Sequence, residues 1–252
     1  MTGLRWAVTF LTRIPVGSVG GPGDTGGSSR WFPVVGAAIG VVVGATYALV
    51  AQVLPSLIAA LIAVLVGVLI TGGLHEDGLG DTADAFGGGL DQADVARILK
   101  DPRHGTFGVI AIAGGLLLRA GAIGSMSPLD GLAMAIVAHS LGRLALVFAM
   151  RFQHSVGGGL GERYARKVTT SDVLVALVAG LGIGAVASGI WVIAALALAL
   201  AAVGVIGRVA RKKLGGSSGD VLGTIEQVAE GAILVLGAAI AHQSWIRPAW
   251  WL

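Results

Sequence analysis

The sequence contains no cysteine, and charged residues make up only 12% of its 252 positions. The absence of cysteine excludes disulfide bridges, a thiolate nucleophile and metal centres with thiolate ligands. Soluble domains carry about 25% charged residues, so half that proportion indicates a membrane protein. The short apolar stretch from Trp6 to Leu11 lacks the features of a signal peptide, and we interpret it as an interfacial helix or an approach to the first span.

Apolar residues, by contrast, make up 55% of the chain. A membrane helix needs about 20 mostly apolar residues. Such runs predict seven spans, at 32–54, 57–72, 108–124, 132–150, two within 173–207 divided near 188–189, and a short one at 231–241. We therefore expect an all-α polytopic membrane protein with a single domain over residues 1–252. Gly36, Gly40 and Gly44 recur every four residues, which favours close helix packing over a ligand role.

The distribution of charge indicates an orientation. With the N-terminus in the cytoplasm, every lysine and arginine falls in a cytoplasmic segment except Arg119, Arg143 and Arg247, and every acid falls there or at its boundary except Asp130. The positive-inside rule therefore favours a cytoplasmic N-terminus and an outside C-terminus. The net charge of +3 is attributed to contact with the lipid bilayer rather than with nucleic acid.

The acidic segment after the second span carries most of the functional signal. Asp77, Asp81 and Asp84 follow each other at i, i+4 and i+7, so a helix would place them on one face. Three like charges there repel each other unless a cation lies among them. Carboxylate oxygens suit Mg²⁺ or Mn²⁺, so we predict a divalent metal site. A solvated acidic loop is the alternative. Neighbouring His75 is either a metal ligand, a base or an interface residue.

A basic segment follows, in which Lys100, Arg103 and His104 surround Asp101 and Pro102, which predict a turn or a helix start. Acidic groups for a metal together with basic groups for phosphate oxygens are the arrangement expected for phosphoryl transfer. The alternative is ordinary basic flanking of a span.

A Gly/Ser-rich loop near the C-terminal end leads to Asp220 and then to a helix. Asp220 is predicted to contact the metal or the substrate. Glu226 and Glu230, at i and i+4, enter the membrane edge, where charges are costly unless they are paired or face a wet cavity.

Two arginines fall within spans. Arg143 follows His139 by one turn, and an intramembrane arginine indicates a functional site with a carboxylate or phosphate partner. Arg119 lies nearer the outer half of its span, and we interpret it as a side chain that extends toward the outer surface.

The segment from Gly72 to Gly89 resembles the signature of cobalamin synthases, the adenosylcobinamide-GDP ribazoletransferase family. Other stretches are similar to further motifs of that family, in the same order along nearly the whole chain: 10–16, 32–36, 100–108 and 219–226. Ala85 and Pro102 depart from the expected Gly and Ser, and neither change removes a carboxylate. The resemblance implies a Mg²⁺-dependent enzyme of the bacterial inner membrane that joins adenosylcobinamide-GDP to α-ribazole or its 5′-phosphate and releases GMP.

Carried onto this sequence, the resemblance suggests roles for particular residues. Metal would be held on the diphosphate by a set of acids: Glu76, Asp77, Asp81, Asp84 and Asp220. Lys100, Arg103 or Arg143 would offset phosphate charge, and His75 or a carboxylate would accept the hydroxyl proton. Further substrate contacts are assigned to Arg13, His104 and Gly219. We expect Asp77, Asp81, Asp84 and Asp220 to converge on one cation, on the cytoplasmic face.

Two alternatives stay open at this point. A CDP-alcohol type phosphotransferase would space its acids around an Ala-Arg pair, which this sequence does not show. An ion-coupled transporter would place ionisable residues near the midplane and broken spans in paired halves, whereas these acids gather at one face. No pattern in the sequence decides whether the chain forms a homo-oligomer.

Overall fold

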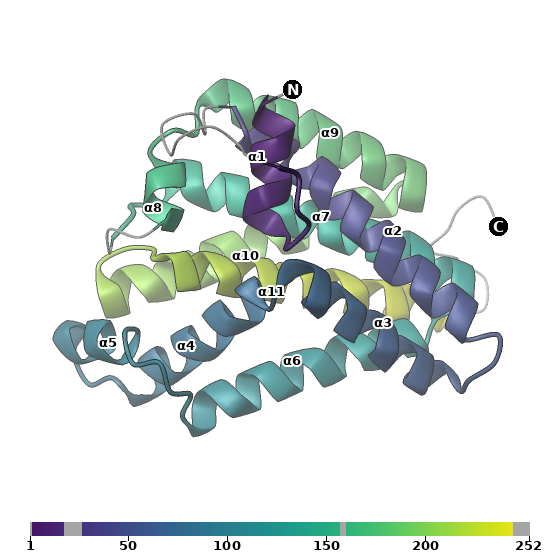
Figure 1. Ribbon diagram of the computed structural model, residues 1–252, viewed down its shortest axis with the longest axis horizontal. Helices are drawn as coiled ribbons and strands as arrows, with labels where there is room; N and C mark the ends of the chain where they lie inside the picture. Colours follow the sequence, from purple (N-terminus) through teal and green to yellow (C-terminus); the bar gives the residue numbers. More distant parts are fainter. Residues whose placement is uncertain (1, 18–26, 157–159, 244–252) are drawn as a thin grey trace.

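The structure is a computed structural model that describes residues 2–17, 27–156 and 160–243, so Arg247 lies outside the described residues. Apart from one isolated bridge between Ser155 and Ser217, the regular elements of these residues are all helices. The order (Figure 1) is α1 Thr2–Leu11, η1 Ser29–Trp31, α2 Phe32–Val50, α3 Ser56–Thr71, α4 Leu74–Gly88, α5 Gln92–Ile98, α6 Thr106–Gly124, α7 Pro128–Phe152, α8 Leu160–Ala165, α9 Thr170–Ser188, α10 Trp191–Leu214 and α11 Gly219–Ala241. The all-α prediction is confirmed for the described residues.

Six helical segments in the described ranges are long and apolar enough to cross a membrane: α2 with its preceding turn, α6, α7, α9, α10 and α11. Helices α3 and α4 pass the same test only as a pair, and they are bent by 93° at the break between them. Gly72 and Gly73 form that break, and both have the left-handed φ that glycine adopts without strain, +70° and +71°. The expected seven spans are therefore reached only if this bent pair counts as one.

One expected boundary is confirmed and another needs correction. The predicted break near Ser188 is confirmed, because α9 ends there and α10 begins at Trp191. The last span, expected at 231–241, begins twelve residues earlier, at Gly219. The reason is that Glu226 and Glu230 point into the helix bundle and meet arginines there, so the helix carries these charges without exposing them to lipid.

Helix α7 is the most enclosed of the candidate spans, and it contacts α2, α9, α10 and α11. The close approach of α2 depends on its glycines. A Cβ on Gly36 would collide with the carbonyl oxygen of His139, and one on Gly40 would collide with that of Ala135. The packing role predicted for these glycines is therefore confirmed.

Contacts between helix ends show that α2 and α9 run in the same direction and that α7 runs in the opposite direction. The starts of α2 and α9 meet where Arg30 Nε donates to Asp172 Oδ1 over 2.8 Å. At the other end of the bundle, Tyr47 of α2 donates its hydroxyl to the Met126 carbonyl, between α6 and α7, over 2.7 Å. The acidic helix α4 leaves the end of α3 and packs against α6 and α11 (Figure 1).

Candidate active site at the bend between α3 and α4

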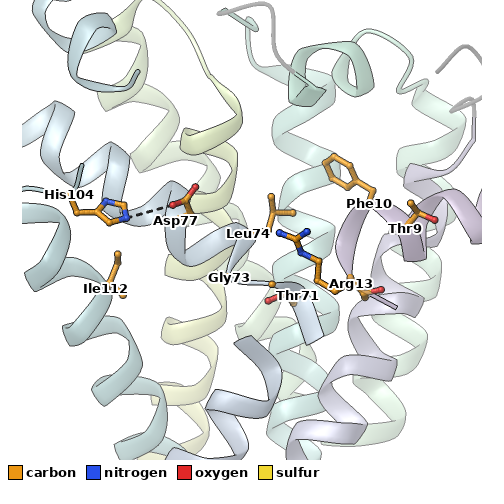
Figure 2. A pocket seen from close by; sticks show the side chains of 11 residues that line it. Thr9, Phe10, Arg13, Thr71, Gly73, Leu74, Asp77, His104 and Ile112 are labelled. Atoms are coloured by element: carbon orange, nitrogen blue, oxygen red, sulfur yellow. Dashed lines mark ion pairs between the residues drawn. The ribbon is translucent and has the colours of Figure 1, made fainter. Parts of the chain in front are cut away.

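Helix α4 presents two of the predicted aspartates to an imidazole. His104 Nδ1 lies 3.3 Å from Asp81 Oδ1. His104 Nε2 lies 3.6 Å from Asp77 Oδ1 (Figure 2). One ligand atom from each of the three residues lies within 4.8 Å of the others. This Asp77–Asp81–His104 group is partly open, since the Asp77 side chain is 68% exposed. It is an arrangement that can hold a cation.

Asp84, the third aspartate on this face, has a different set of partners. Its two carboxylate oxygens accept hydrogen bonds from the backbone N–H groups of Gly105, over 2.6 Å, and Gly108, over 2.8 Å. These N–H groups belong to the first turn of α6, which has no side-chain cap of its own. Asp84 therefore caps α6 from a distance and holds the loop that carries His104 against α4.

Asp220 reaches the site from the start of α11. The backbone there lies so close to α4 that a Cβ on Gly78 would stand 2.8 Å from the Asp220 carbonyl oxygen. Thr224 Oγ1 donates to the Gly78 carbonyl over 3.0 Å and fixes this contact. The Asp220 side chain accepts from Ser218 Oγ at 3.3 Å. Asp220 therefore lies beside α4 but outside the Asp77–Asp81–His104 group. Of the four aspartates expected to converge on one cation, Asp77 and Asp81 lie together with His104, and a ligand role for Asp84 and Asp220 stays a prediction.

Two cavities meet at Asp77. The first, here called the Arg13 cavity, has a volume of about 610 Å³ and is lined by Thr9, Phe10, Thr12, Arg13, Thr71, Gly72, Gly73, Leu74, Asp77, His104 and Ile112 (Figure 2). The second, here called the Lys100 cavity, has a volume of about 630 Å³ and is lined by Thr9, Phe10, Leu74, His75, Asp77, Ala96, Leu99, Lys100, Leu146, Met150, Val156, Leu214, Ser218, Gly219, Asp220, Leu222 and Gly223. Sequence reasoning did not find this pair of cavities.

Arg103 points away from both cavities. Its guanidinium binds the Asp101 carboxylate through two hydrogen bonds, and its side chain is 85% exposed. Those hydrogen bonds lower the pKa of Asp101 to about 2, so Asp101 stays ionised as the partner of Arg103. The turn predicted at Asp101 is confirmed, whereas the three basic residues do not form the compact group that their spacing suggested.

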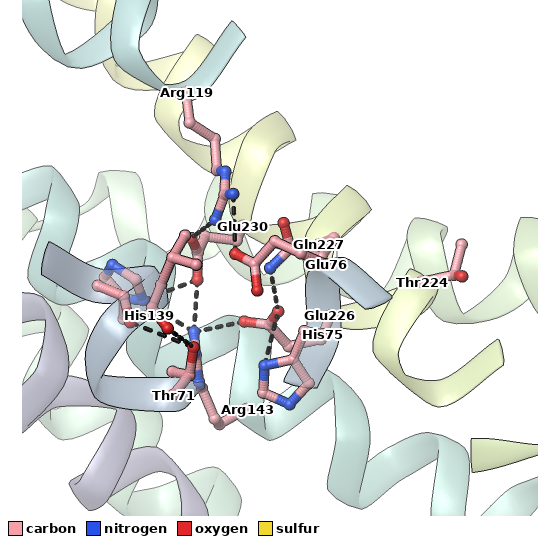
Figure 3. Close-up of polar contacts among 12 residues, drawn as sticks. Thr71, His75, Glu76, Arg119, His139, Arg143, Thr224, Glu226, Gln227 and Glu230 are labelled. Carbon is pink, nitrogen blue, oxygen red and sulfur yellow. Dashed lines mark hydrogen bonds and ion pairs between the residues drawn. The ribbon is translucent and has the colours of Figure 1, made fainter. Parts of the chain in front are cut away.

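Glu76 and Arg119 face the interior of the bundle rather than the metal group. Arg119 donates to Glu76 Oε1 and to Glu230 Oε1, over 2.9 Å in each case (Figure 3). Both Glu76 and Arg119 are buried. The interpretation of Arg119 as a side chain extending to the outer surface was therefore wrong, because two carboxylates from distant helices supply a partner inside the bundle. Glu76 uses one oxygen for this pair, so the geometry does not support its place in the metal shell.

The same interior holds Arg143, which pairs with both Glu226 and Glu230. His139 Nδ1 lies 2.7 Å from Glu230 Oε2, and His75 Nδ1 lies 3.4 Å from Glu226 Oε2 (Figure 3). The partner predicted for Arg143 is thus a carboxylate, and Arg143 lines neither of the two large cavities.

These residues are called the buried ion-pair cluster below: His75, Glu76, Arg119, His139, Arg143, Glu226 and Glu230. The cluster joins the first turn of α4, directly before Asp77, to α6, α7 and α11. In a low-dielectric interior each charge needs such a partner, so the cluster stabilises the position of α4 as long as all its members are present. The sequence signal that could have revealed it is the pair of glutamates at i and i+4 in α11 together with arginines inside two other spans.

A bundle of membrane-spanning helices with a carboxylate–imidazole group between two cavities at one end of the bundle defines a multi-pass membrane enzyme. The chain matches the cobalamin-5-phosphate synthase family over residues 3–238. It therefore belongs to that family, which confirms the resemblance drawn from its motifs.

Individual relatives agree over most of their length. The chain is 35% identical to the adenosylcobinamide-GDP ribazoletransferase of Leptothrix cholodnii, with 97% of this chain and 94% of the relative covered. It is 35% identical to the protein of the same name from Ralstonia pickettii, with 94% of each covered, and 39% identical to that of Rhizobium meliloti, with 66% of this chain and 67% of the relative covered. No solved structure matches the chain.

Proposed function

We propose that this protein is an adenosylcobinamide-GDP ribazoletransferase. It transfers the adenosylcobinamide phosphate group of adenosylcobinamide-GDP to a hydroxyl of α-ribazole or α-ribazole 5′-phosphate and releases GMP, in the last assembly step of cobalamin. The observation that carries the proposal is the nearly full-length family match, joined to a carboxylate group that opens into two cavities.

The donor set at α4 fits a divalent cation. Asp77 and Asp81 supply the oxygens that Mg²⁺ prefers, and the exposure of Asp77 leaves room for water and phosphate oxygens. The imidazole of His104 makes the group compatible with Mn²⁺ as well. A cation held there by Asp77, Asp81 and His104 would neutralise charge on the diphosphate. Asp220, on the wall of the Lys100 cavity, is a further candidate ligand.

The remaining residues act on the substrates and on each other. Arg13 and Lys100, one in each cavity, offset the charge of phosphate oxygens. The hydroxyl proton goes to His75 or to a carboxylate, and Gly219 leaves space for substrate at the start of α11. Arg143 contributes indirectly, because it holds the glutamates that position α11.

We also propose a location for this site. The positive-inside rule applied to the loops favours a cytoplasmic N-terminus, an outside C-terminus and a site on the cytoplasmic face of the bacterial inner membrane. Apolar side chains exposed on the helix faces, such as Leu69 at 75% and Val178 at 72%, would contact the bilayer. Both cavities are lined by residues of a single chain.

The test is transfer by the purified protein in lipid vesicles, with adenosylcobinamide-GDP, α-ribazole and Mg²⁺. We expect GMP release that stops on chelation and returns with Mg²⁺. Asp77→Asn should lower turnover by about a hundredfold or more while the thermal unfolding midpoint stays at the wild-type value. Asp101→Asn, which removes an acid outside the two cavities, is the matched control and should retain activity. Full activity in Asp77→Asn would refute the assignment.

A further inference from the structure

We infer that the two cavities are separate subsites: the Lys100 cavity binds the flat apolar base of the ribazole acceptor, and the Arg13 cavity binds the nucleotide that leaves as GMP. The inference rests on the proposed function and deepens it, because it states which substrate lies on which side of Asp77.

The Lys100 cavity has the walls that an apolar ring system needs. Leu146 and Met150 of α7 line it, together with Leu99, Leu214 and Leu222 from other elements. Leucine and methionine side chains pack against a flat aromatic base, and the soft methionine sulfur adapts to its shape. A benzimidazole nucleoside such as ribazole is largely apolar at one end and carries hydroxyls at the other. Its ribose can therefore face the polar side of the cavity.

The polar residues that line the Lys100 cavity include Lys100, Ser218 and Asp220. An ammonium group at this position suits the 5′-phosphate form of the acceptor, and the hydroxyl and carboxylate suit ribose hydroxyls. The cavity thus offers apolar contact for the base and polar contact for the sugar, which is the division that this acceptor requires.

The Arg13 cavity has a different chemistry. Arg13 and His104 line it with nitrogen groups, which bind phosphate oxygens (Figure 2). The hydroxyls of Thr9, Thr12 and Thr71 donate to backbone carbonyls of α1 and α3, so their oxygens can accept from ribose hydroxyls. The Arg13 side chain lies directly against Gly72, where a Cβ would collide with the guanidinium Nε. The absence of a side chain at Gly72 therefore allows the Arg13 guanidinium to pack against the bend between α3 and α4.

The two cavities share a wall formed by Thr9, Phe10, Leu74 and Asp77, and Asp77 is the carboxylate of that wall. In an in-line transfer, the attacking and leaving oxygens lie on opposite sides of the phosphorus. A bond forms from the ribazole hydroxyl oxygen to the cobinamide-linked phosphorus, and the bond from that phosphorus to the bridging oxygen breaks. GMP leaves with the bridging oxygen, and the hydroxyl proton goes to the base named above. A phosphate beside Asp77 would border both cavities, which is what this geometry needs.

The test compares two variants that each narrow one cavity. Ala96 is half-buried on α5 and lines only the Lys100 cavity, whereas Ile112 is half-buried on α6 and lines only the Arg13 cavity. We expect Ala96→Phe to raise the KM for α-ribazole about tenfold and to leave inhibition by GMP unchanged. Ile112→Phe should raise the KM for adenosylcobinamide-GDP and the inhibition constant of GMP by a similar factor, with the KM for α-ribazole unchanged.

The opposite pattern, or an equal change of both KM values in both variants, would overturn the inference. Leu99→Trp is a second variant of the Lys100 cavity, for use if Ala96→Phe lowers the thermal unfolding midpoint. The proposed function fails separately, if the wild-type protein forms no product. In that case, calorimetric binding of α-ribazole and of GMP to the same variants still tests the two cavities: loss of α-ribazole binding only in Ala96→Phe and loss of GMP binding only in Ile112→Phe is the result that the inference requires.

Discussion

Replacing Arg119 with methionine tests the buried ion-pair cluster directly. Arg119 is 4% exposed and donates to Glu76 and Glu230 over 2.9 Å each. Methionine has a similar length and no charge, so the variant Arg119→Met leaves two carboxylates with one partner fewer. Glu230 keeps its contacts with Arg143 and His139. Glu76, in contrast, loses its ion pair with Arg119.

The expected cost follows from this difference. Removing one member of a buried ion pair destabilises a protein by about 3–5 kcal/mol, because the remaining charge stays in a low-dielectric interior. The free energy of unfolding in detergent should fall by that amount. Turnover should fall as well and the Mg²⁺ requirement should rise, because Glu76 directly precedes Asp77 on α4 and its release loosens the first turn of that helix.

The double variant Arg119→Met/Glu76→Gln removes the unpaired charge and should regain part of the lost stability. Arg97→Met, which breaks an exposed pair with Asp94, is the matched control and should unfold like wild type. An Arg119→Met protein as stable as the control would refute the reasoning, since that is the result expected of an arginine that extends to the membrane surface. A double variant no more stable than Arg119→Met would refute the pairing with Glu76.

Two further variants separate packing from chemistry. Asp84→Asn should lower the free energy of unfolding by about 1–3 kcal/mol, because an amide oxygen alone cannot accept from both N–H groups at the start of α6. A metal-ligand role would instead raise the Mg²⁺ requirement at unchanged stability, and titration of Mg²⁺ alongside thermal unfolding distinguishes the two. Gly40→Val should lower stability by about 1–3 kcal/mol, because its Cβ would collide with the Ala135 carbonyl, whereas Gly114→Val, with open space at its Cβ, should not. Equal unfolding midpoints for the two glycine variants would contradict the packing of α2 on α7.

Local patterns in the sequence predicted the local features of the fold. Apolar runs predicted the spans, and the break at Ser188 was visible from a run too long for one helix. The spacing of Asp77 and Asp81 predicted that they share a helix face, and α4 confirms it. These predictions succeed because span length, helical periodicity and glycine conformation depend on residues close together along the chain.

The contacts that the sequence did not predict share one property: they join residues that are distant along the chain. Glu76 and Arg119 are separated by 43 residues, and Arg119 and Glu230 by 111. Asp84 meets the N–H groups of Gly105 and Gly108 only because α6 returns along α4. Spacing within one helix cannot reveal such contacts.

The sequence by itself determined the class of protein, its family and the acidic segment in which the site is found. Charge, apolar runs and ordered motifs are properties of the amino-acid sequence, so they can be recognised without a tertiary structure. Only the tertiary structure decided which acids gather around His104, which cap a helix and which pair with arginine. That division depends on how α4, α6, α7 and α11 pack, because a carboxylate inside a membrane bundle takes the donor that a neighbouring helix brings within reach.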